Sequence, residues 1–93
     1  MIGIGGISMS GIAEILHNWG IPVTGSDCTK SKITDRLSSH GIYVTIGHDT
    51  SSVKEADLVI YSAAVKQNDP ELVAARDKHI EIIERADFVR IFN

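Results

Sequence analysis

The sequence predicts an α/β domain in which strands and helices alternate around a parallel sheet. Short strand-like runs alternate with segments whose apolar residues recur at helical spacing, and glycine ends two of these segments, at Gly20 and Gly41. Each helix must pack back on the sheet that it left, so the crossovers are right-handed and the strands parallel. We therefore expect a Rossmann-like three-layer domain with a five-stranded parallel sheet, in the order 3-2-1-4-5, flanked by helices.

The first expected strand and helix surround a glycine-rich turn. Residues 1–6 form the end of a strand and the turn that follows it. A helix is expected at about residues 8–19, because apolar residues recur there at three- and four-residue spacing: Ile12, Ile15, Leu16 and Trp19. Residues 22–26 form a second short strand that ends at Asp27.

The following units repeat this order of elements. Ser31 is the expected N-cap of a helix that runs to His40, and residues 43–46 form the third strand. A short helical turn is expected at residues 51–56. The run at residues 58–61 is the most apolar strand-like segment of the chain, so we expect it to be fully buried.

The last helix and strand are introduced by a helix-start signal. Asp69 followed by Pro70 provides an N-cap and a proline at the first helical position, which predicts a helix to about His79. Residues 80–83 form the expected fifth strand. Residues 85–92 form a terminal helix or a linker.

The composition restricts the classes of function. Twelve acidic and nine basic residues give a net charge of −3, which disfavours nucleic acid as a partner. Cys28 is the single cysteine and cannot form an internal disulfide, which favours the reducing cytoplasm. No apolar run approaches the ~20 residues of a membrane span. We expect a cytoplasmic domain that binds neither nucleic acid nor membrane.

The glycine-rich turn at residues 3–6 is the most informative feature of the sequence. A tight turn between a strand and a helix directs backbone N–H groups into one concavity, and glycine lets an anion approach them. The helix that follows adds roughly half a positive charge at its N-terminus. Each hydrogen bond to a charged oxygen contributes about 1.5–3 kcal/mol, so several N–H groups can hold a diphosphate without a lysine.

Two general phosphate-binding motifs fit this turn only in part. The dinucleotide fingerprint G-x-G-x-x-G fits at Gly3 and Gly5 but has Ser8 at its third glycine. The loop of nucleoside triphosphatases fits residues 6–11, but Ile12-Ala13 replace the lysine and the hydroxyl residue that hold the γ-phosphate and Mg²⁺. The chain by itself is therefore not expected to be an ATPase. An NAD(P)-binding dehydrogenase domain and a non-enzymatic nucleotide-sensing module both stay open.

A series of short motifs follows along the chain. They are Gly3-Ile4-Gly5-Gly6, Met9-Ser10-Gly11-Ile12-Ala13-Glu14, Gly25-Ser26-Asp27, Ile46-Gly47-His48, Tyr61-Ser62-Ala63-Ala64, the run from Asp69 to Arg76, and Arg85-Ala86-Asp87. In their order and spacing they resemble the N-terminal domain of the Mur ligases, over nearly the whole chain. Three residues depart from the usual family pattern, since Ser8 replaces glycine, Ala63 replaces serine and Asp69 replaces asparagine.

The resemblance implies that the domain binds the UDP part of UDP-N-acetylmuramic acid. In the family, ATP phosphorylates the muramyl carboxylate and an amino group attacks the acyl phosphate. The Gly5-Gly6 pair followed by Met9-Ser10 favours the member that adds L-alanine over a relative that recycles a muramyl tripeptide. ATP and Mg²⁺ belong to a central domain, and the amino acid to a C-terminal one. Residues 1–93 are thus expected to be one UDP-sugar-binding domain, an inactive N-terminal fragment that binds no cofactor and whose partners are the remaining ligase domains.

The resemblance also implies which residues contact the substrate. Backbone N–H groups would face the diphosphate around Gly5, Gly6, Ser8, Met9 and Ser10. Beside the uridine would lie Ser26 and Asp27, and the pocket would be closed by His48, Ser62, Ala63 and Ala64. Asp27 also follows Gly5 by about 20 positions, near the spacing at which nucleotide-binding folds place an acid on a ribose hydroxyl. No catalytic residue is expected, and no metal ligands, because the other histidines and Cys28 lack ligand spacing.

Overall fold

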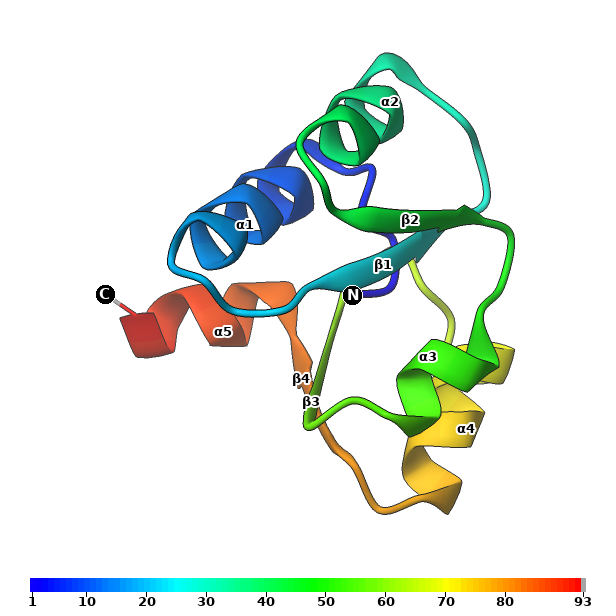
Figure 1. Ribbon diagram of the computed structural model, residues 1–93. Coiled ribbons are helices and arrows are strands. Elements are labelled where there is room, and N and C mark those ends of the chain that lie inside the picture. Colours follow the sequence, from blue (N-terminus) through cyan, green and yellow to red (C-terminus); the bar gives the residue numbers. More distant parts are fainter. Residues whose placement is uncertain (93) are drawn as a thin grey trace.

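The computed structural model of the chain describes residues 1–92. Helices and strands alternate within them: α1 (Ile7–Asn18), β1 (Thr24–Asp27), α2 (Lys32–Ser39), β2 (Tyr43–Ile46), α3 (Thr50–Lys54), β3 (Leu58–Tyr61), α4 (Pro70–Asp77), β4 (Glu81–Glu84) and α5 (Arg85–Phe92). This alternation, visible in Figure 1, confirms the predicted α/β class. Across these 92 residues, no helix has both the length and the apolar character needed to cross a bilayer.

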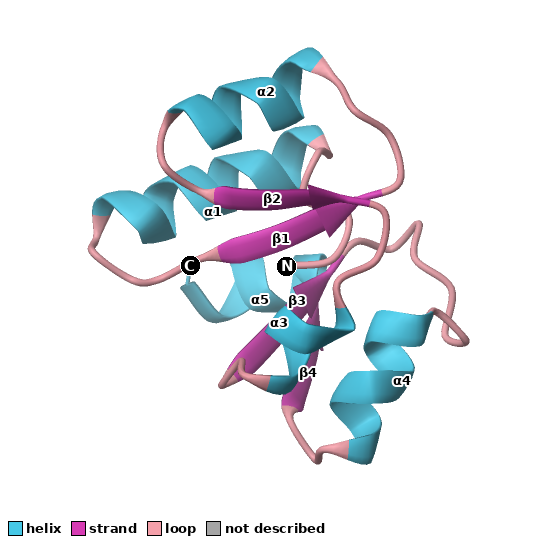
Figure 2. Cartoon of the chain, turned by 45° about the vertical axis from the view of Figure 1, so that its right-hand side comes forward, coloured by secondary structure: helices cyan, strands magenta, loops and turns pink. Residues whose placement is uncertain are grey.

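The strands pair in parallel, but they form two pairs in place of the five-stranded sheet that the sequence predicts. β1 pairs with β2, and β3 pairs with β4 (Figure 2). Ile2 lies between the pairs and forms single parallel bridges to Ser26 of β1 and Tyr61 of β3. The expected first strand is reduced to this one residue, because Gly3 has a φ of 80° and turns the backbone out of the extended conformation.

A hollow remains beside Ile2, where no strand separates β1 from β3. Its volume is about 420 Å³, and its lining includes Val23 and Thr24 on one side and Leu58 and Val59 on the other. None of the residues 3–6 of the glycine-rich turn line this hollow. It is therefore a gap between the two strand pairs and lies apart from the predicted binding residues of the turn.

Helices cover the strands on both faces. Figure 1 shows α1, α2 and α5 on one side of the strands, with α3 and α4 on the other. Consecutive side chains of a strand point to opposite faces. Accordingly, Val59 packs in a buried cluster with Leu72 of α4, whereas Ile60 packs in a cluster with Met9 of α1 and Phe88 of α5. The arrangement has three layers.

Three helices begin at a capping side chain. The Ser31 hydroxyl accepts from the Thr34 amide while the Thr34 hydroxyl accepts from the Ser31 amide, forming a capping box on α2. Asp49 and Asp69 accept from first-turn amides of α3 and α4. The predicted caps Ser31 and Asp69 are thus confirmed. Helix α1 differs, because its N-cap is Gly6, which has no side chain to satisfy the first amides.

The apolar residues whose spacing predicts α1 are not all buried. Trp19 is 61% exposed and Ile15 is 50% exposed, whereas Leu16 is buried. The buried face of the helix runs through Met9, Ala13 and Leu16, so Ile15 lies about 130° away from its centre. Trp19 lies beyond the last helical residue, at the C-cap, so the helical spacing no longer determines which way its side chain points.

The burial of β3 and the end of α4 also differ from the predictions. The strand at residues 58–61 is not fully buried as predicted. Val59 and Ile60 are buried, whereas Leu58 at its start is exposed and Tyr61 at its end is half-buried. Helix α4 ends at Asp77, two residues before the predicted end, and its C-cap is Lys78. The backbone cannot continue as a helix because His79 has a φ of 57°, in the left-handed region.

Strain at His79 predicts a stabilising substitution. The corresponding residues after α1 and α2 are Gly20 and Gly41, whose φ values are 83° and 93°. A residue with a Cβ in the left-handed region costs about 1–2 kcal/mol. Glycine avoids this cost but loses more conformational entropy on folding, which offsets part of the gain. We expect His79→Gly to raise the free energy of unfolding by about 0.5–1 kcal/mol, measured by urea denaturation. His79→Ala keeps the strained Cβ, so equal stability of the two variants would contradict this explanation.

Close packing at Gly25 predicts a destabilising substitution. A Cβ at Gly25 would lie 2.3 Å from Cδ1 and 2.8 Å from Cβ of Ile4, so β1 and the turn would have to separate. We expect Gly25→Ala to lower the free energy of unfolding by about 1–3 kcal/mol. Gly11→Ala is the matched control, since a Cβ there meets nothing within 4 Å and alanine favours helix α1. If both variants unfold at the same urea concentration, the close contact with Ile4 has no energetic effect.

Candidate functional site

The carboxyl ends of the strands meet the glycine-rich turn at one edge of the fold. The Gly3 amide donates to the Ser26 carbonyl at 2.9 Å, and the Gly47 amide donates to the Asp27 carbonyl at 2.8 Å. The Ser62 amide, just after β3, donates to the carbonyl that precedes Gly3 at 3.1 Å. These bonds bring together four sequence segments that contain predicted site residues. Open α/β folds bind their ligands at this edge.

Helix α1 begins at this edge with unbonded amide groups. Its first turn contains no acidic residue, and the Ser10 amide is the first to donate to a helix carbonyl, that of Gly6, at 2.8 Å. Within residues 1–92, no acceptor bonds the amides of Ile7, Ser8 and Met9. Their N–H groups and the positive end of the helix dipole form a site that suits an anion.

The predicted loop residues do not all offer their backbone to a ligand. The Gly5 amide donates to Asp27 Oδ2 at 2.9 Å, and the Gly6 amide donates to the carbonyl of Gly3 at 3.2 Å. The Ser10 side chain is buried, and its hydroxyl donates to the carbonyl of residue 7 at 2.9 Å. Among the predicted residues, Ser8 and Met9 therefore keep open amides. The Ser8 side chain is exposed, and that of Met9 is packed in the core.

Asp27 fixes the turn to the end of β1. Its Oδ2 accepts from the Gly5 amide, and its Oδ1 accepts from the Thr29 amide at 3.1 Å. A Cβ at Gly5 would lie 2.8 Å from Oδ2, so glycine is needed for this approach. The carboxylate is half-buried, which leaves one side of it open to a ligand at the edge.

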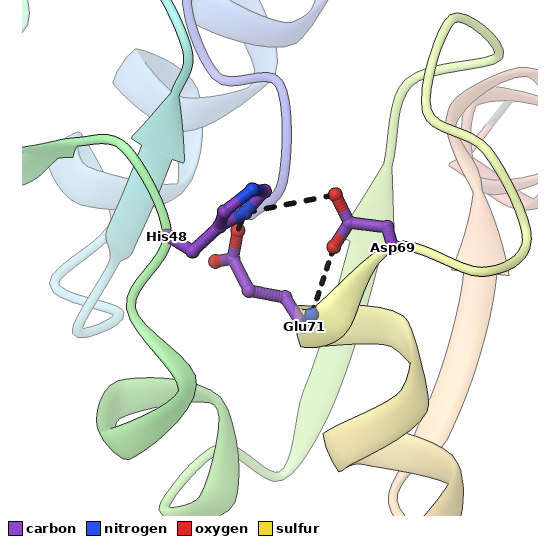
Figure 3. Close-up of side chains that lie close together, drawn as sticks. All are labelled: His48, Asp69 and Glu71. Carbon is purple, nitrogen blue, oxygen red and sulfur yellow. Dashed lines mark hydrogen bonds and ion pairs between the residues drawn. The ribbon is translucent and has the colours of Figure 1, made fainter.

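A buried carboxylate joins three of the segments at the edge. Glu71, in the first turn of α4, is 2% exposed. The Ser26 hydroxyl lies 2.9 Å from its Oε1 and 2.7 Å from its Oε2, and Nδ1 of His48 lies 3.0 Å from Oε1. Figure 3 shows the His48 ring beside the Glu71 carboxylate and facing Asp69, whose Oδ2 lies 3.7 Å from the same nitrogen. The hydrogen bond with Glu71 raises the pKa of His48 above its usual value, and the charges of Asp69 and Glu71 raise it further against the effect of burial.

The sequence analysis placed Ser26 and His48 in the site but missed Glu71. The available signal was the pair of acids in Asp69-Pro70-Glu71, which reads equally well as the capped start of a helix. Burial of Glu71 depends on β1 and the β2 loop, which lie far away along the chain. The Ser26 hydroxyl is hydrogen-bonded to Glu71. The Ser26 side chain therefore stabilises the edge from its buried side.

His48, Asp69 and Glu71 offer three metal-ligand atoms within 4.8 Å of one another. The sequence analysis, which compared spacings along the chain, did not consider this group. Each member already has protein partners, because Asp69 caps α4 and Glu71 is bonded to Ser26 and His48. A cation would also face the positive end of the α4 dipole. We interpret the group as an ion-pair network.

The loop after β3 supplies the remaining predicted residues. The Ser62 side chain is half-buried against the turn, since a Cβ at Gly3 would lie 2.9 Å from its Cβ. Its hydroxyl accepts from the Ala64 amide at 3.3 Å. Ala63 and Ala64 are exposed at the edge.

The residues of the turn do not fit ATP with Mg²⁺. Where a triphosphatase loop has its lysine and hydroxyl residue, α1 has Ile12, which is half-buried, and Ala13, which is fully buried in the core. Neither side chain can bond a γ-phosphate or a metal ion. The edge therefore offers backbone amides to an anion, and no step of ATP chemistry can be assigned to it.

Comparisons with known proteins find several similar chains. The UDP-N-acetylmuramate–L-alanine ligase of Agrobacterium fabrum is 51% identical over 88 residues, and the ligase of the same name from Clostridium botulinum is 47% identical over 88 residues. Each match covers 95% of this chain and 19% of the relative, so the chain spans about a fifth of the length of these relatives.

Solved structures with the same fold carry related names. The UDP-N-acetylmuramate-alanine ligase of Thermotoga maritima superposes with a TM-score of 0.93 at 34% identity, over 98% of this chain and 21% of that one. A UDP-N-acetylmuramate:L-alanyl-γ-D-glutamyl-meso-diaminopimelate ligase from Neisseria meningitides gives 0.82 at 27% identity, over 95% and 28%. The family model described as "Mur ligase family, catalytic domain" matches residues 1–92. The chain therefore belongs to the Mur ligase family, as its ordered glycine and strand-end motifs indicate.

Proposed function

We propose that the chain binds the UDP part of UDP-N-acetylmuramic acid, as the N-terminal domain of an ATP-dependent ligase that joins L-alanine to the muramyl carboxylate. The observation that carries the proposal is the start of α1. Helices α2, α3 and α4 have capping side chains, whereas α1 follows a glycine-rich turn and leaves its first amides without an acceptor. The names of the relatives support the substrate and the reaction.

The diphosphate is proposed to lie at the start of α1, where the amides of Ser8 and Met9 and that of Ile7 donate to its oxygens. Gly5 and Gly6 give the turn its shape, and Ser10 begins the helical bonding behind it. The uridine lies beside Asp27 and the backbone of Ser26. The pocket is closed by His48, Ser62, Ala63 and Ala64. Each of these roles is a proposal for this chain.

The bond-forming reaction is proposed for the larger ligase and not for this chain alone. ATP and Mg²⁺ would be held by other parts of the ligase, since the turn of this chain does not fit them. Those parts, with the UDP-sugar, are the proposed partners, and neither nucleic acid nor membrane is among them. We propose the reducing cytoplasm as the compartment, which suits the exposed free thiol of Cys28.

The two other interpretations of the turn are not retained. A dehydrogenase domain and a nucleotide-sensing module would both bind nucleotides at the same edge. The relatives reported above are ligases, and three of the four act by name on UDP-N-acetylmuramate and L-alanine.

Removal of one amide tests the proposed diphosphate site. Ile7→Pro removes the first-turn N–H group, and Gly6, with ψ of 152°, already has the extended backbone that proline requires before it. Ile7→Ala retains the N–H group and loses the same exposed side chain. We expect the proline variant to bind UDP about tenfold more weakly than the alanine variant, measured by calorimetry or amide chemical shifts. Equal affinities of the two variants would contradict the proposed role of the helix start.

Ligand specificity gives an independent test. Uridine lacks the diphosphate, so we expect it to shift the amide resonances of residues 7–9 far less than UDP does, at equal millimolar concentration. Saturable shifts at Gly5 and Asp27 should accompany UDP binding. If UDP leaves all of these resonances unchanged, the proposed function of the chain is wrong.

A further inference from the structure

Glu71 is a buried charge whose partners come from two other segments. A carboxylate that is 2% exposed needs hydrogen-bond donors to offset its lost hydration. The Ser26 hydroxyl lies within bonding distance of both oxygens but has a single proton to donate. The second donor is His48, whose Nδ1 lies 3.0 Å from Oε1. Since a carboxylate can only accept, Nδ1 must carry a proton in this contact.

This contact determines which nitrogen of His48 is available to a ligand. With Nδ1 bonded to Glu71, the remaining nitrogen is Nε2, and the side chain is 46% exposed. In neutral imidazole Nε2 has a lone pair and would repel a phosphate oxygen. In the protonated imidazole Nε2 carries a hydrogen and a share of the positive charge, so that it attracts the same oxygen.

The charged groups around His48 favour its protonated form. Glu71 and Asp69, both from the start of α4, lie beside Nδ1. From the loop after β2, Asp49 is turned to α3, where hydrogen bonds from the side chain and amide of Ser52 lower its pKa. From the segment before β1, the amino group of Met1 donates to the carbonyl of Thr24 at 2.7 Å. Burial lowers the pKa of that amino group to about 6, while the charge of Glu71 acts in the opposite direction.

His48 is the cationic group that these contacts place at the ligand edge. The side chains of Lys30, Arg36 and Arg90 are each paired with a carboxylate, those of Asp35, Glu14 and Asp87. The Gly47 amide bonds to Asp27, which in turn bonds to the Gly5 amide, so the loop that carries His48 is joined to the glycine-rich turn.

We propose that Glu71 is a positioning residue for the diphosphate site: it holds Nδ1 of His48, so that a protonated imidazole presents Nε2–H to the ligand. The inference rests on the proposed function and adds a residue that does not itself touch the ligand. The Ser26 hydroxyl, bonded to the same carboxylate, keeps Glu71 in place. Binding of a diphosphate then depends on the protonation of this histidine.

The test measures affinity against pH for three forms of the chain: wild type, Glu71→Gln and His48→Gln. The probe is UDP-N-acetylglucosamine, because a diphosphate esterified at both ends does not itself titrate between about pH 5 and 8. Glu71→Gln retains the size of the side chain and one acceptor oxygen, but it replaces the other oxygen with a donor NH₂ group and removes the charge. Glu55→Gln, at an exposed position, is the matched control with the same change of net charge. The amino group of Met1 titrates in the same range, and the His48→Gln profile shows its contribution.

We expect wild-type affinity to fall as pH rises through the pKa of His48, since only the protonated ring attracts the diphosphate. Glu71→Gln should move this fall to lower pH, so that the variant binds several-fold more weakly near neutrality and equals wild type near pH 5. His48→Gln should remove this fall, and Glu55→Gln should behave as wild type. A loss of affinity that is equal at every pH, or a Glu71→Gln profile identical to wild type, would overturn the inference.

Two further outcomes separate the inference from the proposed function. If wild type binds the UDP-sugar with no pH dependence attributable to His48, the role of Glu71 fails and the proposed function stands. If wild type does not bind at all, both fail. Should Glu71→Gln not fold, NMR titration of the wild-type imidazoles decides: the pKa of His48 should lie above the usual value of an imidazole and rise when the UDP-sugar is added. A His48 pKa at or below the usual value would overturn the inference.

Discussion

The hydrogen bonds between the glycine-rich turn and the end of β1 are the constraint on which the site depends. The Ser26 carbonyl accepts from the amides of Gly3 and Ile4 at 2.9 and 3.0 Å, and Asp27 accepts from the amide of Gly5. These contacts fix the direction in which α1 leaves the strands, and therefore the direction of its unbonded amides. They require close approach, which is why Gly25 lies against Ile4 and Gly5 against Asp27.

The site combines donors for an anion with carboxylates that are already satisfied. Asp27 and Glu71 would repel a diphosphate if they were free. Instead, Asp27 accepts from backbone amides of the turn and the following loop, and Glu71 accepts from Ser26 and His48. The same carboxylates that hold the edge together also favour a positive charge on His48. In a chain of net charge −3, the proposed affinity for a diphosphate thus depends on the local orientation of N–H groups.

Features that depend on neighbouring residues were predictable. The caps at Ser31 and Asp69 and the strands at residues 43–46 and 58–61 have the predicted positions, because capping and strand formation depend on side chains within a few residues. The five-stranded sheet was not confirmed, because one backbone dihedral, at Gly3, limits the first strand to a single residue that bridges β1 and β3. Spacing alone could not show that Trp19 lies past the end of α1.

The sequence by itself determined the α/β class, the glycine-rich turn and membership of the Mur ligase family, since these are written in residue types at fixed spacings. Tertiary structure alone decided which groups stay available for a ligand. The amide of Gly5 donates to Asp27 and the hydroxyl of Ser26 donates to Glu71, whereas the amides of Ser8 and Met9 have no acceptor among the described residues. That outcome depends on contacts between atoms from distant parts of the chain, and the spacing of residues along a sequence does not show which distant residues are in contact.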